Sequence, residues 1–199
     1  MRRRINIKFT FNGKFNFITP HFAAHRKNEI MDENETSLPA KTVKESQSEM
    51  VEMVLPNDAN PLGALLGGRL MHWIDLAGAL AAHRHSRSYV VTASTDHLDF
   101  LVPVHVGDVV IFKSSVNRVF HTSMEIGVKV WVESYTTGDR RHVSSAYLTF
   151  VAVDRHGRKR PVPQVIAETD EEKRRYDDAA RRRDFQQAER QRRIDAKRA

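Results

Sequence analysis

The sequence contains no cysteine among its 199 residues. Disulfides, thiolate nucleophiles and zinc–thiolate sites are thereby excluded together. The chain also has no apolar run long enough to cross a bilayer, and its N-terminus lacks the continuous apolar segment of a secretory signal. We therefore expect a soluble, cytoplasmic protein in a reducing setting, without a membrane partner.

The middle of the chain has nearly equal numbers of positive and negative residues, although the whole chain has a formal net charge of +7. The first thirty residues are basic with one acid, Glu29, and the last thirty are dense in arginine. The basic charge is therefore a property of the two ends rather than of a binding groove. The C-terminal arginines lack interleaved aromatic residues, so we expect no nucleic-acid partner.

The N-terminal 47 residues predict a flexible extension. Residues 1–30 are nearly free of acids, as transit peptides are, but they show no clear helical periodicity. We interpret them as a disordered extension or as the product of a start codon assigned too early, with Met31 or a later Met as the true start. Residues 31–46 are polar and predict a flexible lead-in.

Residues 48–165 predict one domain of the α+β class. A short strand near residues 50–54 stops at Pro56. A core helix is predicted over residues 67–85, because apolar residues recur there at helical spacing: Leu70, Trp73, Ile74, Ala77, Leu80 and Ala81. Four further strands are predicted over residues 89–100, 108–120, 123–135 and 141–153. Their short connections predict an antiparallel meander, hence a five-stranded sheet with one helix across it.

The C-terminal segment, residues 166–199, predicts a charged helical tail. Pro161 and Pro163 end the domain, and the residues that follow are strong helix formers with interleaved charges and little apolar face. We expect this helix to be solvated or frayed.

A glycine-rich turn precedes the core helix. Gly67 and Gly68 stand at the start of the helix, where free backbone N–H groups and the helix dipole favour a polarised oxygen. The turn is not a phosphate-binding loop, because the lysine and hydroxyl residue of that motif are missing. The chain also lacks the G-x-S-x-G motif of serine hydrolases.

Asp75 lies two turns inside this helix, on a stripe of mostly small residues. An acid in an apolar helix is costly unless it is paired. Asp75 is therefore either a structural residue, facing solvent or pairing with His72, or a catalytic one. The glycines upstream and Asn60 in the turn favour catalysis.

Several motifs in order make the chain resemble one known family. The run D-x-N-x-x-G-x-x-x-G-G before a helix ending in W-I-D is followed by V-V-T-A-S-T-D-H-L-D-F, V-G-D-V-V, T-S-M-E and F-V-A-V-D-x-x-G-R. These motifs, over about residues 48–180, resemble the acyl-CoA thioesterases (acyl-CoA hydrolases) of the hotdog fold, in their bacterial single-domain branch. The resemblance implies a curled antiparallel sheet wrapped around a central helix.

The resemblance also implies a mechanism and an assembly. Asn60 and Asp75 match the catalytic pair, which different subunits contribute at a dimer interface; a homodimer is expected, and a trimer of dimers. The carbonyl of a fatty acyl-CoA would lie at the N–H groups of Gly67 and Gly68. Asp75 would activate water or attack directly to form an anhydride, and Asn60 would orient the reactants. No cofactor is expected, because coenzyme A is part of the substrate.

Weaker candidates surround this pair. Thr92 and Ser123 match positions near the site in relatives, but each is equally an ordinary strand residue. The phosphates of coenzyme A call for cations, for which the candidates are Arg118, Arg158, Lys159 and Arg160; a solvated basic turn explains the last three equally well. His83, His85 and His97 lack the spacing of a zinc signature, so we expect surface residues or residues behind the site, and no metal. A non-catalytic acyl-CoA sensor is the alternative function.

Overall fold

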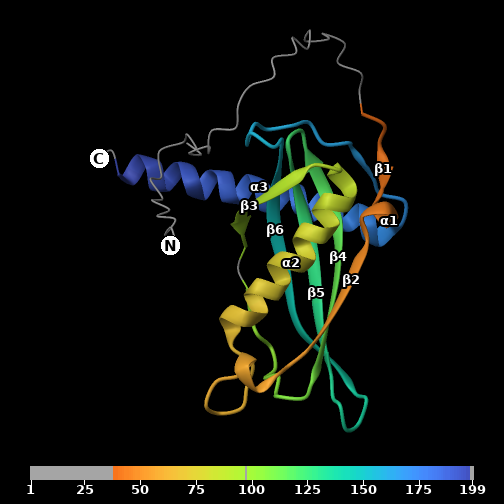
Figure 1. Ribbon diagram of the computed structural model, residues 1–199. Coiled ribbons are helices and arrows are strands. Elements are labelled where there is room, and N and C mark those ends of the chain that lie inside the picture. Colours follow the sequence, from red (N-terminus) through yellow and green to blue (C-terminus); the bar gives the residue numbers. More distant parts are fainter. Residues whose placement is uncertain (1–37, 97, 198–199) are drawn as a thin grey trace, which may run out of the picture. The chain divides into compact units, whose positions relative to one another are not determined.

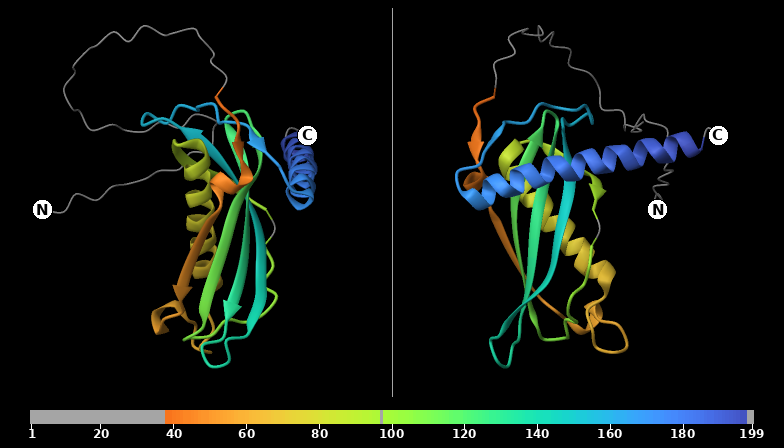
Figure 2. Two further views of the ribbon diagram at one scale, coloured as in Figure 1. Left: turned by 90° about the vertical axis from the view of Figure 1, so that its right-hand side faces the viewer. Right: turned by 180° about the vertical axis from the view of Figure 1, so that it is seen from behind.

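The computed structural model describes residues 38–96 and 98–197. Five antiparallel strands form one curled sheet in the order β2 (Ser48–Met53), β4 (Val109–Phe120), β5 (Ser123–Glu133), β6 (Arg140–Val153) and β3 (Tyr89–Thr95). Helix α2 (Gly67–Ser86) lies on the inner face and α3 (Asp170–Ala196) crosses the outer face (Figures 1 and 2). The predicted α+β class, the sheet wrapped around one helix and the helical C-terminal segment are confirmed.

Helix α2 forms where the apolar periodicity predicts it, and its buried side meets the sheet. Leu70, Trp73 and Ile74 are nearly inaccessible to solvent. Gly78 allows the closest approach, because a Cβ atom there would stand 2.9 Å from Cε2 of Phe150 on β6. The small residues of the helix thus serve mainly to bring α2 against the sheet.

The predicted meander is wrong at β3. This strand ends at Thr95 rather than residue 100, and it pairs with β6, with Thr92 opposite Phe150. The segment that follows remains beside β6, where the amide of Asp96 donates to the carbonyl of Tyr147, before the chain reaches β4. Strand β3 is therefore an edge strand with one described neighbour.

The folded part begins earlier than the predicted boundary at residue 48. Strand β1 (Lys41–Thr42) pairs in parallel with β7 (Val165–Ile166), and the single-turn helix α1 (Val43–Ser46) follows it. Val43 and Ser46 are buried, and the Ser46 hydroxyl accepts a hydrogen bond from the Val116 amide. The flexibility predicted for residues 1–47 is therefore wrong for residues 41–46, whereas residues 1–37 lie outside the described part.

The first half of α3 packs against the sheet. The expectation that the C-terminal helix is solvated or frayed is therefore wrong for this half. Thr169 caps the helix by accepting a hydrogen bond from the Glu172 amide. On the outer face of the sheet, the guanidinium of Arg182 donates to the buried carboxylate of Glu125 on β5, with N–O distances of 2.7 and 3.1 Å, and lies 3.7 Å above the Tyr147 ring. Polar side chains of the sheet therefore hold a helix that has little apolar surface.

Candidate active site

The start of α2 is left without a cap of its own. Its N-cap residue is Leu66, which has no side-chain acceptor, and the first turn contains no acid. Within residues 38–96 and 98–197, the amides of Gly67 and Gly68 have no acceptor, because the hydrogen-bond ladder starts at Arg69. A Cβ atom on Gly68 would meet nothing within 4 Å. Two backbone donors at the positive end of the helix dipole are thus free to bind an oxygen atom.

The turn before α2 is organised by Asn60. Its Oδ1 accepts hydrogen bonds from the amides of Leu62 and Ala64 at 2.9 and 3.2 Å. Gly63 closes the turn with φ of +74°, a conformation that favours glycine. The amide oxygen of Asn60 is therefore occupied by its own backbone, and its Nδ2 group is the part that can donate to a ligand.

A half-buried ion pair fixes this turn to the helix, and the sequence alone did not reveal it. Asp58, in the 3-10 turn η1 (Pro56–Asp58), is 4% exposed and accepts from Nε of Arg69 at 2.6 Å. Its other oxygen accepts from the Leu55 amide. The only sequence signal was an acid in the turn and a base in the first turn of the helix, which are common features. The pair ties the Asn60 turn to the free end of α2.

Asp75 and Thr92 are brought into direct contact. The Thr92 hydroxyl donates to Oδ1 of Asp75 across 2.6 Å, from the edge strand to the helix. Oδ2 of Asp75 has no partner in the described part of the chain, and no ion pair joins Asp75 to His72 there. The pairing with His72 is therefore wrong, whereas Asp75 is partly exposed to solvent, as the structural alternative also allowed. Thr92 orients the carboxylate and leaves one oxygen free for chemistry.

The free amides and Asp75 of one chain are far apart. Asp75 lies eight residues beyond Gly67, which is about 12 Å along the axis of an α-helix. A nucleophile and the oxygen of the carbonyl that it attacks are separated by only about 3 Å. One copy of the chain therefore contains two separate parts of a site rather than one assembled site.

Ser123 and Arg118 lie on the outer face of the sheet, opposite α2, so within one chain they are remote from Asp75, and their predicted roles at a site shared between subunits stay predictions. Side chains alternate along a strand, so Ser123 points away from the face that its neighbour Met124 shares with α2. The Ser123 hydroxyl instead accepts from Arg183 of α3. Arg118 donates to the Tyr176 carbonyl and lies 4.0 Å above the Tyr176 ring. Both residues anchor α3.

Arg158, Lys159 and Arg160 lie in an exposed turn after β6. Asp154 shapes this turn by accepting hydrogen bonds from the amides of Arg158 and His156, and these bonds, that of Arg158 first, lower the pKa of Asp154. Within one chain this turn is at the end of β6 beside the C-terminus of α2, away from the Gly67 end. A role in binding phosphate stays a prediction.

Of the three histidines, His97 lies outside the described residues. His83 is exposed, as one of the two predicted alternatives has it, whereas His85 is fully buried and so is not a surface residue. Nε2 of His85 bonds the Pro163 carbonyl at 2.8 Å, and its Nδ1 has no partner. No set of three His, Cys, Asp or Glu side chains in the described ranges is arranged to hold a metal ion. Nor does any described helix have the length and apolar character to span a membrane.

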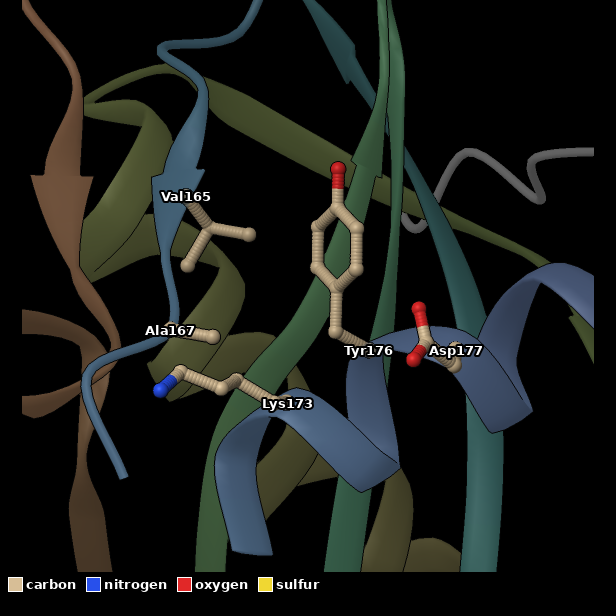
Figure 3. Close-up of a pocket in the computed structure, with 5 residues that line it drawn as sticks. All are labelled: Val165, Ala167, Lys173, Tyr176 and Asp177. Atoms are coloured by element: carbon tan, nitrogen blue, oxygen red, sulfur yellow. The ribbon is translucent and has the colours of Figure 1, made fainter. Parts of the chain in front are cut away.

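Two surface cavities differ in their relation to these residues. The larger, about 350 Å³, lies between β7 and the start of α3, and Figure 3 shows its lining residues, Tyr176 among them. None of the predicted site residues lines it. The smaller, about 150 Å³, lies at the start of α2 and is lined by Gly67, Phe100 and apolar neighbours. We consider the smaller cavity the relevant one, because its wall carries a free backbone donor.

The edge next to Asp75 is apolar and open. On β3, Tyr89 and Val91 are 67% and 44% exposed. On the adjoining side of α2, Met71, Leu76 and Leu80 are between 42% and 48% exposed. A strand edge flanked by large apolar side chains is typical of an interface.

Comparisons with known proteins agree on one family. Residues 62–138 match the family model of the thioesterase superfamily. An uncharacterized acyl-CoA thioester hydrolase of Bacillus subtilis is 44% identical over 129 residues, which are 65% of this chain and 75% of that protein. A solved hexameric acyl-CoA thioesterase is 39% identical, with a TM-score of 0.74 over 76% of this chain and 97% of that one.

A third relative offers a residue-level comparison. The acyl-CoA hydrolase of Staphylococcus aureus, solved with butyryl coenzyme A, is 37% identical with a TM-score of 0.72, covering 80% of this chain and 95% of that one. Alanine variants of its asparagine, aspartate and threonine have been solved, and these residues are 15 and then 17 positions apart. Asn60, Asp75 and Thr92 have the same two spacings, 75 − 60 = 15 and 92 − 75 = 17.

Proposed function

The chain belongs to the acyl-CoA thioester hydrolases of the thioesterase superfamily, and from this premise we propose that it hydrolyses fatty acyl-CoA to free acid and coenzyme A with Asp75 as the catalytic carboxylate. The observation that carries the proposal is the 2.6 Å hydrogen bond from Thr92 to Asp75, at an open apolar edge. The matching spacing in the Staphylococcus aureus hydrolase supports it.

The site is completed by a second copy of the chain. Because about 12 Å of helix separates Gly67 from Asp75 in one copy, the carbonyl-binding amides and the carboxylate of one reaction come from different subunits. Pairing of two β3 edges would cover Tyr89, Val91 and the exposed apolar side of α2. A symmetric dimer then contains two equivalent sites. The hexameric relatives support further assembly as a trimer of dimers.

The proposed chemistry follows from the free atoms. The amides of Gly67 and Gly68 bind the thioester oxygen, where negative charge develops during attack, in the manner of an oxyanion hole. Oδ2 of Asp75 from the other subunit takes a proton from the attacking water, or attacks the carbonyl carbon itself to give an anhydride that water then opens. Nδ2 of Asn60 donates a hydrogen bond that orients the water or the thioester. The exposed turn with Arg158 and Lys159 supplies cations for the phosphates of coenzyme A.

Thiol release from acyl-CoAs of graded chain length tests the proposal directly. We expect Asp75→Asn, which keeps the size of the side chain, to reduce kcat by at least about a hundredfold. Thr92→Val keeps the β-branched shape and removes the hydroxyl, so we expect a loss of about ten- to 150-fold in kcat, from a hydrogen bond to a charged group. Arg192→Ala, on the exposed part of α3, is the matched control and should retain full activity.

Release of thiol by Asp75→Asn at the wild-type rate, with the variant still dimeric, would overturn the assignment of Asp75. Tight binding of acyl-CoA without release by any variant or by the wild type would instead support the non-catalytic sensor. Labelled water detects one chemical route: in a single turnover, an anhydride opened at its aspartyl carbonyl leaves the label in the aspartate, whereas general-base catalysis places it in the product acid.

A further inference from the structure

Helix α3 continues beyond the sheet that holds it. Residues 170–183 are anchored through Tyr176, Ala179, Arg182 and Arg183. The described polar contacts after residue 183 are within the helix, between Gln191 and Asp195 and between Arg193 and Glu189. Residues 184–196 extend about 20 Å at the rise of an α-helix. Figure 1 and the right-hand view of Figure 2 show this half passing the β3 edge.

The side of α3 that faces the sheet continues along the distal half. At 100° per residue, residues 186, 190, 193 and 197 lie on the same side of the helix as Ala179, Arg182 and Arg183. Arg190 and Arg193 therefore point toward the plane of the sheet, whereas Arg192 points to solvent. The distal half presents cations toward a surface that a single copy lacks.

The position of Arg190 relative to the strands can be derived from two spacings. The helix crosses β5 at Arg182 and Arg183, because Arg182 contacts Glu125 on β5 and Tyr147 on β6, whereas Arg183 contacts Ser123 on β5 and the Phe120 ring on β4. Arg190 lies about 12 Å further along the helix. Since α3 runs across the strands (Figure 1) and neighbouring strands are about 4.8 Å apart, this distance extends past β6 and β3. Arg190 thus lies beside the edge at which the β3 strand of a paired copy would be.

The register of such a pair places an aromatic ring below Arg190. Two antiparallel β3 strands are related by a twofold axis perpendicular to the sheet, which keeps both outer faces on the same side. If the seven residues of the two β3 strands overlap fully, Ser94 is opposite the partner subunit's Val90. Within one chain, Ser94 is opposite Thr149 on β6, and Thr149 is opposite Glu125 on β5, so these residues lie in one row across the sheet. The partner subunit's Tyr89 and Val91 flank that point. Their side chains are on the outer face, because Thr92 points to α2.

We propose that the distal half of α3 binds the outer face of the partner subunit's sheet, with Arg190 stacked on the ring of the partner subunit's Tyr89. The inference rests on the dimer of the proposed function. Arginine already contacts aromatic rings in this way within one chain, because Arg182 lies 3.7 Å above Tyr147 and Arg183 lies 4.0 Å above Phe120. The helix thereby ties each subunit across the shared edge.

Cross-linking tests the contact, because the chain has no native cysteine. Two full-length chains with different tags are co-expressed, one with Arg190→Cys and the other with Tyr89→Cys, and treated with a short bis-maleimide. We expect a covalent band that carries both tags. The matched control replaces Arg190→Cys with Arg192→Cys, on the opposite side of the same helix, and should give little of that band. Equal bands from the two positions would overturn the proposal.

Dimer affinity gives a second measurement that keeps the proposal separate from the function. Each dimer has two copies of the contact, so Arg190→Ala should weaken dimer association about tenfold, and Arg192→Ala should leave it unchanged. If Arg190→Ala leaves the dimer affinity unchanged in a protein that is dimeric and fully active, the α3 contact alone is overturned. A protein that hydrolyses acyl-CoA as a monomer would overturn the shared β3 edge, and with it the composite site and the α3 contact.

Discussion

Replacing Arg182 by Met should release the first half of α3 from the sheet. The Glu125 carboxylate is 4% exposed and accepts from both Nε and Nη2 of Arg182 and from Nδ2 of Asn117. Met retains the apolar stem of arginine but offers no donor. The variant leaves a buried carboxylate with a single amide partner, which is the costly half of a broken ion pair.

The expected cost is about 2–3 kcal/mol. Removal of one partner from a fully buried pair costs about 3–5 kcal/mol. The Arg182 side chain is 20% exposed, so water can partly solvate the orphaned Glu125 and reduce that figure. Burial lowers the pKa of Arg182, but the hydrogen bond and charge of Glu125 outweigh burial and raise that pKa overall.

A double-mutant cycle in urea unfolding, at one fixed protein concentration, measures this cost. On a Glu125→Gln background the buried charge is gone, so Arg182→Met should cost less than about 1 kcal/mol there. Arg181→Met is the control, because Arg181 is 74% exposed and pairs with Asp178 on the surface; it should change stability by less than about 0.5 kcal/mol. Equal costs for Arg182→Met on both backgrounds would refute the reasoning.

Three further outcomes are expected. Gly78→Ala should destabilise the protein by about 1–3 kcal/mol in thermal or urea unfolding, because the new Cβ would stand 2.9 Å from Phe150; unchanged stability would mean that the helix shifts freely. Gly68→Ala should be neutral or stabilise by up to about 1 kcal/mol in the same assay, since the position is open. His85 should make folding depend on pH: burial, chiefly, lowers its pKa below the ordinary value of 6.5, so the unfolded chain binds the proton more tightly. Stability is then complete above that value and falls as pH drops through it toward the folded pKa. His85→Gln should flatten unfolding free energy measured from pH 5 to 8, and an unchanged slope would assign the dependence elsewhere.

Local patterns were sufficient where one element decides the structure. Helix α2 could be predicted from apolar spacing, and β4, β5 and β6 from β-branched runs, because both periods are properties of a single segment. The pairing of β3 with β6 could not be predicted in this way. Short loops suggest that consecutive strands are neighbours in the sheet. The chain between β3 and β4 instead hydrogen-bonds to β6, through Asp96 and Leu101, and these contacts have no local signature in the sequence.

The candidate site followed the same division. Asn60, Asp75 and the two glycines could be proposed from one short segment and from the family resemblance. The face of a strand residue is set by register, so Ser123 could not be assigned to the α3 side from sequence. Burial of His85 likewise depends on a carbonyl 78 residues away. The packing of α3 escaped prediction because hydrophobic periodicity does not detect a helix held by arginines.

The unfinished start of α2 sets a limit on how far this protein can be stabilised. An N-cap such as Asp or Ser in place of Leu66 would ordinarily add about 0.5–2 kcal/mol to the stability of a helix. Its side-chain oxygen would do so by accepting hydrogen bonds from the same amides that a substrate carbonyl requires. In the stabilised variant, this side chain would therefore compete with the substrate for those amides. Screens for thermal tolerance and screens for turnover should therefore select opposite residues at position 66.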